Sequence, residues 1–116
     1  MKEKISILCP TRGRPQNIKS LLNSAKDTAS NFENLEFVFY IDNDDLESAD
    51  TIYGLPFENV KIIKGERIVL SEMWNKCYEI ATGKIFMHCG DDIVFGSKGW
   101  DSKVQEAFSS YPDRIA

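Results

Sequence analysis

Two adjacent carboxylates, Asp91 and Asp92, follow directly on the mostly apolar run Lys84–Cys89 and on Gly90. If that run is a buried strand, both acids stand at its carboxyl end, beside a glycine whose backbone can approach a ligand closely. Like charges repel, so such a pair persists most easily around a cation or in water. Mg2+ or Mn2+ commonly takes one or two carboxylates plus substrate phosphates. The pair therefore predicts a metal site at Asp91 and Asp92, with a solvated acidic turn as the alternative.

A second polar segment reads Pro-Thr-Arg-Gly-Arg-Pro and spans Pro10–Pro15. It offers the hydroxyl of Thr11, the guanidinium groups of Arg12 and Arg14, and the start of a helix just beyond. Guanidinium forks and free backbone N–H groups both favour phosphate. The loop is therefore a candidate phosphate site, although it is no Walker motif. A tight turn with two solvated arginines is the alternative interpretation.

A third polar segment follows the apolar run that ends at Ile41. Asp42 should sit at the tip of that strand, where its carboxylate can accept hydrogen bonds from a base N–H or from ribose hydroxyls. Asp44 is a weaker candidate for ligand contact, and Asp45 fits a structural role as the N-cap of the next helix. Arg67, after the third strand-like run, is placed near the same site with an uncertain register.

These polar segments must be positioned by alternating strands and helices. Runs rich in β-branched and aromatic residues predict strands at Ile5–Cys9, Leu35–Ile41, Val60–Lys64 and Lys84–Cys89. Apolar residues at helical spacing predict helices at about 15–29, 46–53, 71–83 and 100–111, with Pro15 in the first turn of the first and Ser71 as the N-cap of the third. Strands that alternate with helices predict βαβ units and a largely parallel sheet.

The predicted fold is therefore α/β, a Rossmann-like, open and mainly parallel sheet of about four strands with helices on both faces. No repeat, linker or low-complexity tract divides residues 1–116, so we expect a single domain. In such a sheet, ligands bind outside the carboxyl ends of the strands. The arginine loop and both acidic segments lie at such ends. If their strands are neighbours, they form a crevice suited to a metal-bound phosphate ester.

Composition narrows the class of protein. The chain has 116 residues, 42% of them hydrophobic, and a net charge of -4, which is typical of an ordinary globular domain. Because no basic stripe dominates, we expect no nucleic-acid partner, and no apolar stretch is long enough for a membrane span. The cysteines Cys9, Cys77 and Cys89 form no CxxC pair and lie in or beside apolar runs. Buried, reduced thiols and a cytoplasmic location are therefore expected.

Two aromatic or titratable residues have competing interpretations. His88 lies within the fourth strand without a second His or Cys at ligand spacing, so a core or edge histidine is favoured over a zinc ligand. Trp100 follows the loop Gly96–Gly99 and is assigned to packing, with an exposed indole that stacks on a sugar face as the alternative.

Taken together and in order, these segments resemble the family 2 glycosyltransferases of the GT-A fold. Ile5–Pro15 looks like the opening strand and Pro-Thr-Arg-Asn-Arg-Pro-like loop of that family, and Phe37–Asp42 like its second strand. Asn75–Gly83 looks like its Asn-x-Gly…Ala-x-Gly segment, and Gly90–Asp92 stands where the metal-binding Asp-x-Asp motif belongs. The resemblance spans Lys4 to about Trp100, the nucleotide-binding N-terminal portion of the family.

The resemblance implies that the chain binds a UDP- or GDP-sugar through Mn2+ or Mg2+ and transfers the sugar to an acceptor. It implies that Thr11 and Arg14 help to hold the nucleotide, that Asp42 contacts the base or ribose, and that Asp91 and Asp92 bind the cation. Together with the polar segments described above, the predicted nucleotide-binding residues are Pro10, Thr11, Arg12, Arg14, Asp42, Asp44, Arg67 and Asp91, and the predicted metal ligands are Asp91 and Asp92. Gly90 replaces the usual first acid, and no residue matches the general base of the family, so no catalytic residue is assigned. The acceptor stays unknown, and a homodimer is one way to cover the open side of the sheet.

Two other functions stay open. The first is a non-catalytic nucleotide-sugar binding module, or a partial enzyme without the acceptor half, which would bind a donor without turning it over. The second is a phosphoacceptor receiver domain, which has similar length and topology. A receiver domain needs an acid pair after the first strand and an aspartate after the third, where this chain has Thr11–Arg14 and Lys64–Glu66. The receiver interpretation is therefore disfavoured.

Overall fold

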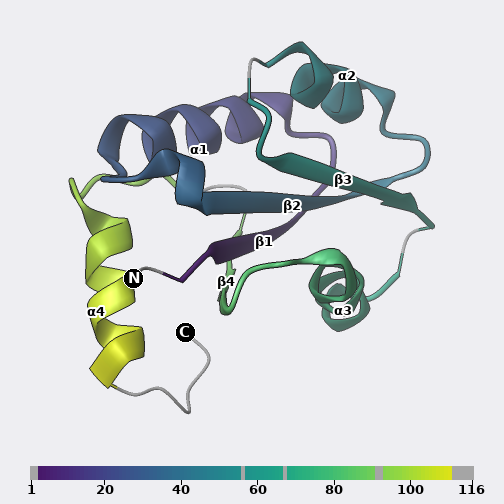
Figure 1. The fold of residues 1–116 in the computed structure, drawn as a ribbon. Helices are drawn as coiled ribbons and strands as arrows, with labels where there is room; N and C mark the ends of the chain where they lie inside the picture. Colours follow the sequence, from purple (N-terminus) through teal and green to yellow (C-terminus); the bar gives the residue numbers. More distant parts are fainter. Residues whose placement is uncertain (1–2, 56, 67, 91–92, 111–116) are drawn as a thin grey trace.

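A computed structural model describes residues 3–55, 57–66, 68–90 and 93–110, in which strands and helices alternate (Figure 1). The strands are β1 (Ile5–Thr11), β2 (Leu35–Asp42), β3 (Val60–Gly65) and β4 (Ile85–His88). The helices are α1 (Pro15–Thr28), α2 (Leu46–Gly54), α3 (Leu70–Ile80) and α4 (Trp100–Ser110), with a short 3-10 helix at Phe32–Asn34. Every predicted strand and helix is present, with bounds that differ by a few residues.

The four strands form one parallel sheet in the order β3-β2-β1-β4, so the predicted fold class is confirmed. In this register Thr11 pairs with Ile41, and Asp42 pairs with Gly65. The carboxyl ends of all four strands therefore meet at one edge. Along the chain, β2 and β3 are added to one side of β1, and β4 is then added to the other side of β1. The border between β1 and β4 is thus the switch point, where open α/β sheets bind ligands.

Helices α1 and α2 lie over one face of the sheet, and α3 lies over the other (Figure 1). The α1 residues at helical spacing, Ile18, Leu21, Leu22 and Ala25, are fully buried against strand residues that include Phe37. Each large apolar side chain buried in this way contributes roughly 1.5–3 kcal/mol. This face holds the larger core, which fixes β1 and β2 and, with them, the loops at their carboxyl ends.

Helix α3 covers the opposite face through Cys77, which packs in a cluster with Leu8, Val38 and Tyr40. The helix begins at Leu70 with Val69 as its N-cap, so the predicted cap at Ser71 is wrong. Val69 has an extended backbone, with ψ 154°, and its carbonyl accepts the N–H groups of Glu72 and Met73. These hydrogen bonds make Val69 the residue at which the helix starts. Ser71 therefore lies one position inside the first turn.

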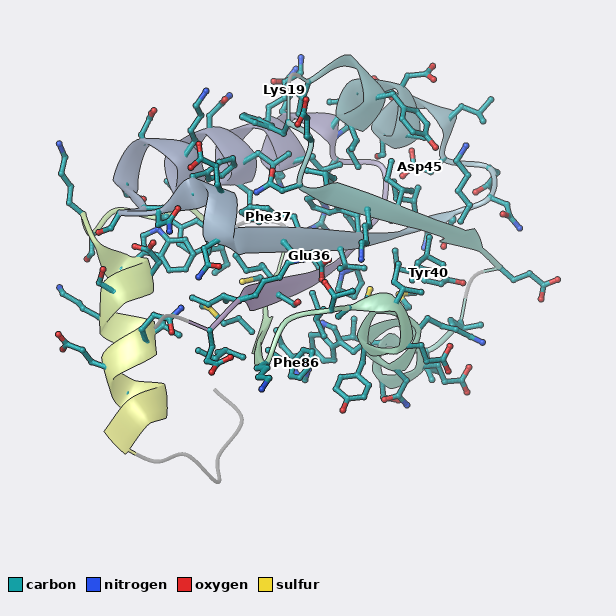
Figure 2. The ribbon with its side chains drawn as sticks, viewed as in Figure 1. Lys19, Glu36, Phe37, Tyr40, Asp45 and Phe86 are labelled. Carbon is teal, nitrogen blue, oxygen red and sulfur yellow. The ribbon has the colours of Figure 1, made fainter. Side chains whose placement is uncertain are left out.

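Glu36, near the amino end of β2, is a buried carboxylate on the α3 side of the sheet, whereas its neighbour Phe37 faces α1 (Figure 2). Its oxygens accept hydrogen bonds from Ser6 Oγ at 2.8 Å and from the Thr82 N–H and hydroxyl at 2.8 and 2.9 Å. The Lys61 ammonium lies 2.7 Å away. Burial by itself would raise the pKa of Glu36, but these partners lower it to about 2.

Gly83 belongs to the same network, because its N–H donates to Ser6 Oγ at 2.9 Å. A Cβ added at Gly83 would lie 2.6 Å from the Lys4 carbonyl oxygen and 2.9 Å from the Ser6 nitrogen. Backbone atoms that close leave room only for glycine. The Ala81–Gly83 segment therefore has a structural explanation: it joins α3 to β4 at the amino end of the sheet, away from the arginine loop.

Helix α4 begins at Trp100, whose side chain is 8% exposed and stacks on Phe95 with ring centroids 4.2 Å apart. The packing interpretation of Trp100 is thus confirmed, and the exposed sugar-stacking alternative is wrong. Asp101 accepts the N–H groups of Ser30 and Asn31 at 2.7 and 2.8 Å. In the described part of the chain, no helix combines the length and hydrophobicity that a membrane span requires.

Candidate functional site

A cleft of about 490 Å³ lies at the carboxyl ends of β1 and β4, beside the switch point of the sheet. Its lining combines the loop after β1, the start of α3 and the residue after β4, namely Pro10, Thr11, Arg12, Arg14, Leu70, Met73 and Gly90. The sheet therefore brings the four predicted loop residues to one hollow. It also brings Gly90, which directly precedes the acid pair, to the same hollow.

The loop after β1 reaches across to the end of β2. The Arg12 Nε atom lies 3.4 Å from Asp42 Oδ2, and the Arg12 side chain is 56% exposed while that of Asp42 is 5% exposed. Asp42 is thus a nearly buried carboxylate beside a solvent-facing cation. Gly13, the next residue of the loop, has a φ of 62°, a left-handed conformation that favours glycine.

A second hollow of about 510 Å³ lies beside this ion pair and is lined by Asp42, Asn43, Asp44, Gly65 and Glu66. The Arg12–Asp42 contact links the two hollows, because Arg12 lines the arginine-lined cleft and Asp42 lines this acidic one. Gly65 has no room for a side chain, since a Cβ there would collide with the Tyr40 ring. The Tyr40 hydroxyl in turn donates to the Glu66 carbonyl at 2.6 Å, which fixes this wall of the hollow.

Asp45 is the N-cap of α2, as predicted, because its Oδ1 accepts the Ser48 N–H at 3.2 Å. The sequence did not indicate its second contact: Oδ2 accepts the Gly13 N–H at 2.6 Å. Burial would raise the pKa of Asp45, but the Gly13 and Ser48 hydrogen bonds and the charge of Arg12 lower it. The carboxylate therefore stays ionised and ties the arginine loop to α2.

Three predicted site residues, Arg67, Asp91 and Asp92, lie outside the described residues. Within the described part of the chain, no group of three or more His, Cys, Asp or Glu side chains could hold a metal ion. The metal site predicted at Asp91 and Asp92 therefore stays a prediction.

His88 occupies the end of β4 and is exposed. Its ring stacks on the indole of Trp74, with centroids 4.7 Å apart and an interplanar angle of 12°. The two rings join β4 to α3, which fits the predicted edge histidine.

The three cysteines are free and buried, as expected. Burial raises the pKa of the Cys77 thiol to about 12 and that of Cys89 to about 11. Both therefore stay protonated at neutral pH, where a thiol is a poor nucleophile and a poor metal ligand.

Two residues of the cleft were missed by the sequence reasoning as site residues. Leu70 and Met73, on the first turn of α3, form its apolar wall, and Leu70 is 52% exposed. Their position in the sequence, and not their residue type, could have identified them as site residues. The first turn of a helix that follows a parallel strand lies at the edge of the sheet where ligands bind.

Two solved structures share this arrangement of strands and helices. The mannosyltransferase PcManGT from Pyrobaculum calidifontis, in complex with GDP-Man and Mn2+, matches with a TM-score of 0.76 and 15% identity over 92% of this chain and 32% of its own. TarS 1-349 from S. aureus matches with a TM-score of 0.74 and 18% identity over 94% of this chain and 33% of its own.

The chain thus spans about a third of the length of each of these structures. A scan against family models and a search of curated proteins found no match. At such low identities the likeness concerns the fold. The parallel sheet, its helices and these two structures together show that the chain has a GT-A-like glycosyltransferase fold.

Proposed function

We propose that the chain binds a nucleotide-diphospho-sugar, a UDP- or GDP-sugar, and forms the donor-binding domain of a metal-dependent, family 2-like glycosyltransferase. The observation that carries the proposal is the arginine-lined cleft beside the switch point, together with its Arg12, which lies 3.4 Å from Asp42 at the end of β2. Guanidinium groups suit a diphosphate, and a nearly buried carboxylate suits base N–H groups or ribose hydroxyls. The two chemistries lie side by side, as they must for a ligand that carries both groups.

In this proposal each part of the donor has its own residues. Arg12 and Arg14 bind the diphosphate, while Asp42 and Asp44 accept hydrogen bonds from the nucleoside. Thr11 supplies a hydroxyl to the cleft and is 6% exposed, so its position is fixed by the end of β1. Pro10 forms part of the wall, and Arg67, outside the described residues, is assigned to the same nucleotide site.

Asp91 and Asp92 are the proposed ligands for Mn2+ or Mg2+, and Asp91 also contacts the nucleotide. Two carboxylates that begin immediately after a residue of the cleft wall, Gly90, are a donor set that fits a hard divalent cation. When bound, the cation offsets the charge that develops on the nucleoside-diphosphate leaving group. The PcManGT structure contains Mn2+ with GDP-Man, so Mn2+ is the first metal to test.

A binding module without transfer is the alternative, and one observation favours it. The described residues that line the cleft include no carboxylate and no imidazole, the groups that most often act as the general base on an acceptor hydroxyl. Incubation with Mn2+ and UDP- or GDP-sugars separates the two functions. Release of free nucleoside diphosphate supports transfer or hydrolysis, whereas metal-dependent binding of an intact donor supports the binding module.

The proposed cellular setting is the cytoplasm, which fits three buried, free cysteines. The acceptor is not assigned. A homodimer in which a second copy completes the acceptor surface is part of the proposal, and sedimentation velocity of the purified protein tests it.

Calorimetric titration tests donor binding. We expect UDP or GDP to bind more tightly with Mn2+ than with a chelator, and Asp91→Ala and Asp92→Ala each to abolish most of that difference. If neither variant weakens metal-dependent binding, the metal assignment is wrong. If no nucleoside diphosphate binds at any metal concentration, the proposed function itself is wrong.

A further inference from the structure

The carboxylate of Asp45 joins two different elements beside the cleft. One oxygen accepts the N–H of Ser48 at the start of α2, and the other accepts the N–H of Gly13 in the loop after β1, at 2.6 Å. An N-cap needs the first contact only. The second contact has no role in α2 and acts on the arginine loop.

The contact with Gly13 controls where two cleft residues can lie. Gly13 stands between Arg12 and Arg14, and its φ of 62° gives the backbone a left-handed conformation there. Glycine is permissive at such an angle and by itself leaves the loop free to adopt other conformations. A hydrogen bond from its N–H to a charged acceptor selects one of them, and such bonds are stronger than neutral ones.

The same loop is anchored at Arg12, 3.4 Å from Asp42, so two carboxylates of one short segment hold it. The Arg12 contact joins an exposed cation to a nearly buried carboxylate and holds one long side chain. The Gly13 contact, although exposed, is a short hydrogen bond to the backbone itself, so Asp45 is the carboxylate that acts directly on the path of the loop.

We propose that Asp45 is a positioning residue for the diphosphate: through the Gly13 N–H it holds the loop in the conformation that keeps Arg12 and Arg14 at the cleft. This inference rests on the proposed donor-binding function and adds to it a residue that touches no part of the donor. It makes the arginine loop preorganised in the free protein, so that less ordering is required when the diphosphate binds.

Asp45→Ser separates this role from capping. Serine is a good N-cap and keeps an acceptor for the Ser48 N–H, but one short hydroxyl cannot also serve the Gly13 N–H. Asp45→Ala removes both contacts. Asp50→Asn, an exposed position on the same helix, removes one charge without touching the loop and is the matched control.

The experiment measures Gly13 amide exchange in the free protein by NMR and the dissociation constants of GDP or UDP, with Mg2+, and of the matching nucleoside. We expect Asp45→Ser to speed Gly13 exchange, to keep the thermal midpoint within about 2 °C, and to weaken diphosphate binding about tenfold with a smaller effect on the nucleoside. Asp50→Asn should match the wild-type protein in each measurement.

Wild-type diphosphate affinity in Asp45→Ser, or an equal loss for diphosphate and nucleoside, overturns the positioning role while leaving the proposed function standing. A wild-type protein that binds no nucleoside diphosphate overturns the proposed function, and the positioning role with it. Unchanged Gly13 exchange in Asp45→Ser shows that the hydrogen bond does not hold the loop, whatever the protein binds.

Discussion

The Nε atom of Arg12 lies 3.4 Å from Oδ2 of Asp42, so an ion pair joins the loop after β1 to the end of β2. The two strands pair in parallel with Thr11 opposite Ile41. Arg12 follows Thr11 and Asp42 follows Ile41, so the two partners of the ion pair lie at the same level where the strands end. The ion pair is therefore a consequence of register. It puts a cation suited to phosphate beside a carboxylate suited to a nucleoside, at the border of two hollows.

Asp42→Asn should weaken nucleoside-diphosphate binding by roughly 10- to 100-fold, because a hydrogen bond to a charged acceptor contributes about 1.5–3 kcal/mol. Unlike a substitution in the phosphate loop, it should weaken binding of the nucleoside as strongly as that of the diphosphate. Titration calorimetry with both ligands measures the effect.

The matched control for Asp42→Asn is Asp50→Asn, which removes an exposed charge from α2. It should leave both affinities unchanged. An Asp42→Asn protein that binds the nucleoside as well as the wild type does would contradict the assigned role of Asp42.

Because Glu36 is a buried, ionised carboxylate, we expect the free energy of unfolding to fall at acid pH. Its pKa is lowered from 4.5 to about 2 in the folded protein, so its stabilising contribution is complete above pH 4.5 and is lost as the pH falls toward 2. By linkage this contribution is at most about 3 kcal/mol, and less because Lys4 and Lys61 are partly exposed. Urea unfolding of the wild-type protein and of Glu36→Gln should differ most near pH 7 and converge near pH 2.

Glu79→Gln, on the exposed side of α3, is the control for Glu36→Gln and should change stability by less than about 0.5 kcal/mol. A stability gap between Glu36→Gln and the wild type that is the same at pH 7 and pH 2 would show that the Glu36 carboxylate is not the titrating group.

Gly83→Ala should destabilise the fold by about 1–3 kcal/mol, because the new Cβ would lie 2.6 Å from the Lys4 carbonyl oxygen. Gly54→Ala, which meets nothing within 4 Å, should instead be neutral or stabilising by about 0.4–1 kcal/mol. Chemical denaturation of both variants measures these effects. If Gly83→Ala has the same urea midpoint of unfolding as the wild-type protein, then the connection between α3 and β4 does not approach Lys4 and Ser6 as closely as described.

The architecture could be predicted from the sequence because local patterns determine most of it. Runs rich in β-branched and aromatic residues marked the four strands, and the spacing of Ile18 to Ala25 marked the buried face of α1. Asp45 was recognised as a cap from its position before a helix. The prediction of a cap at Ser71 was wrong for a local reason: the Val69 carbonyl accepts the N–H groups of Glu72 and Met73, so the helix begins before Ser71.

The site could be predicted only in part, because its contacts join residues far apart in the chain. Nothing near Gly13 in the sequence points to Asp45, and nothing near Glu36 points to Thr82 or Lys61. Such pairs follow from strand register and from the path of the loops, which composition and periodicity do not encode. Leu70 was missed for the same reason, since its place at the cleft depends on sheet order.

If the cleft beside the switch point binds a nucleoside diphosphate, the backbone amide resonances of the residues around it change when the ligand is added, and NMR chemical-shift mapping measures that change. On addition of GDP or UDP with Mg2+, we expect the largest shifts at Thr11, Arg12, Asp42 and Gly90. Shifts that instead cluster at the separate hollow lined by Lys26, Phe32, Glu33, Phe57, Glu58 and Asn59, or no shifts at all, would contradict binding at this cleft.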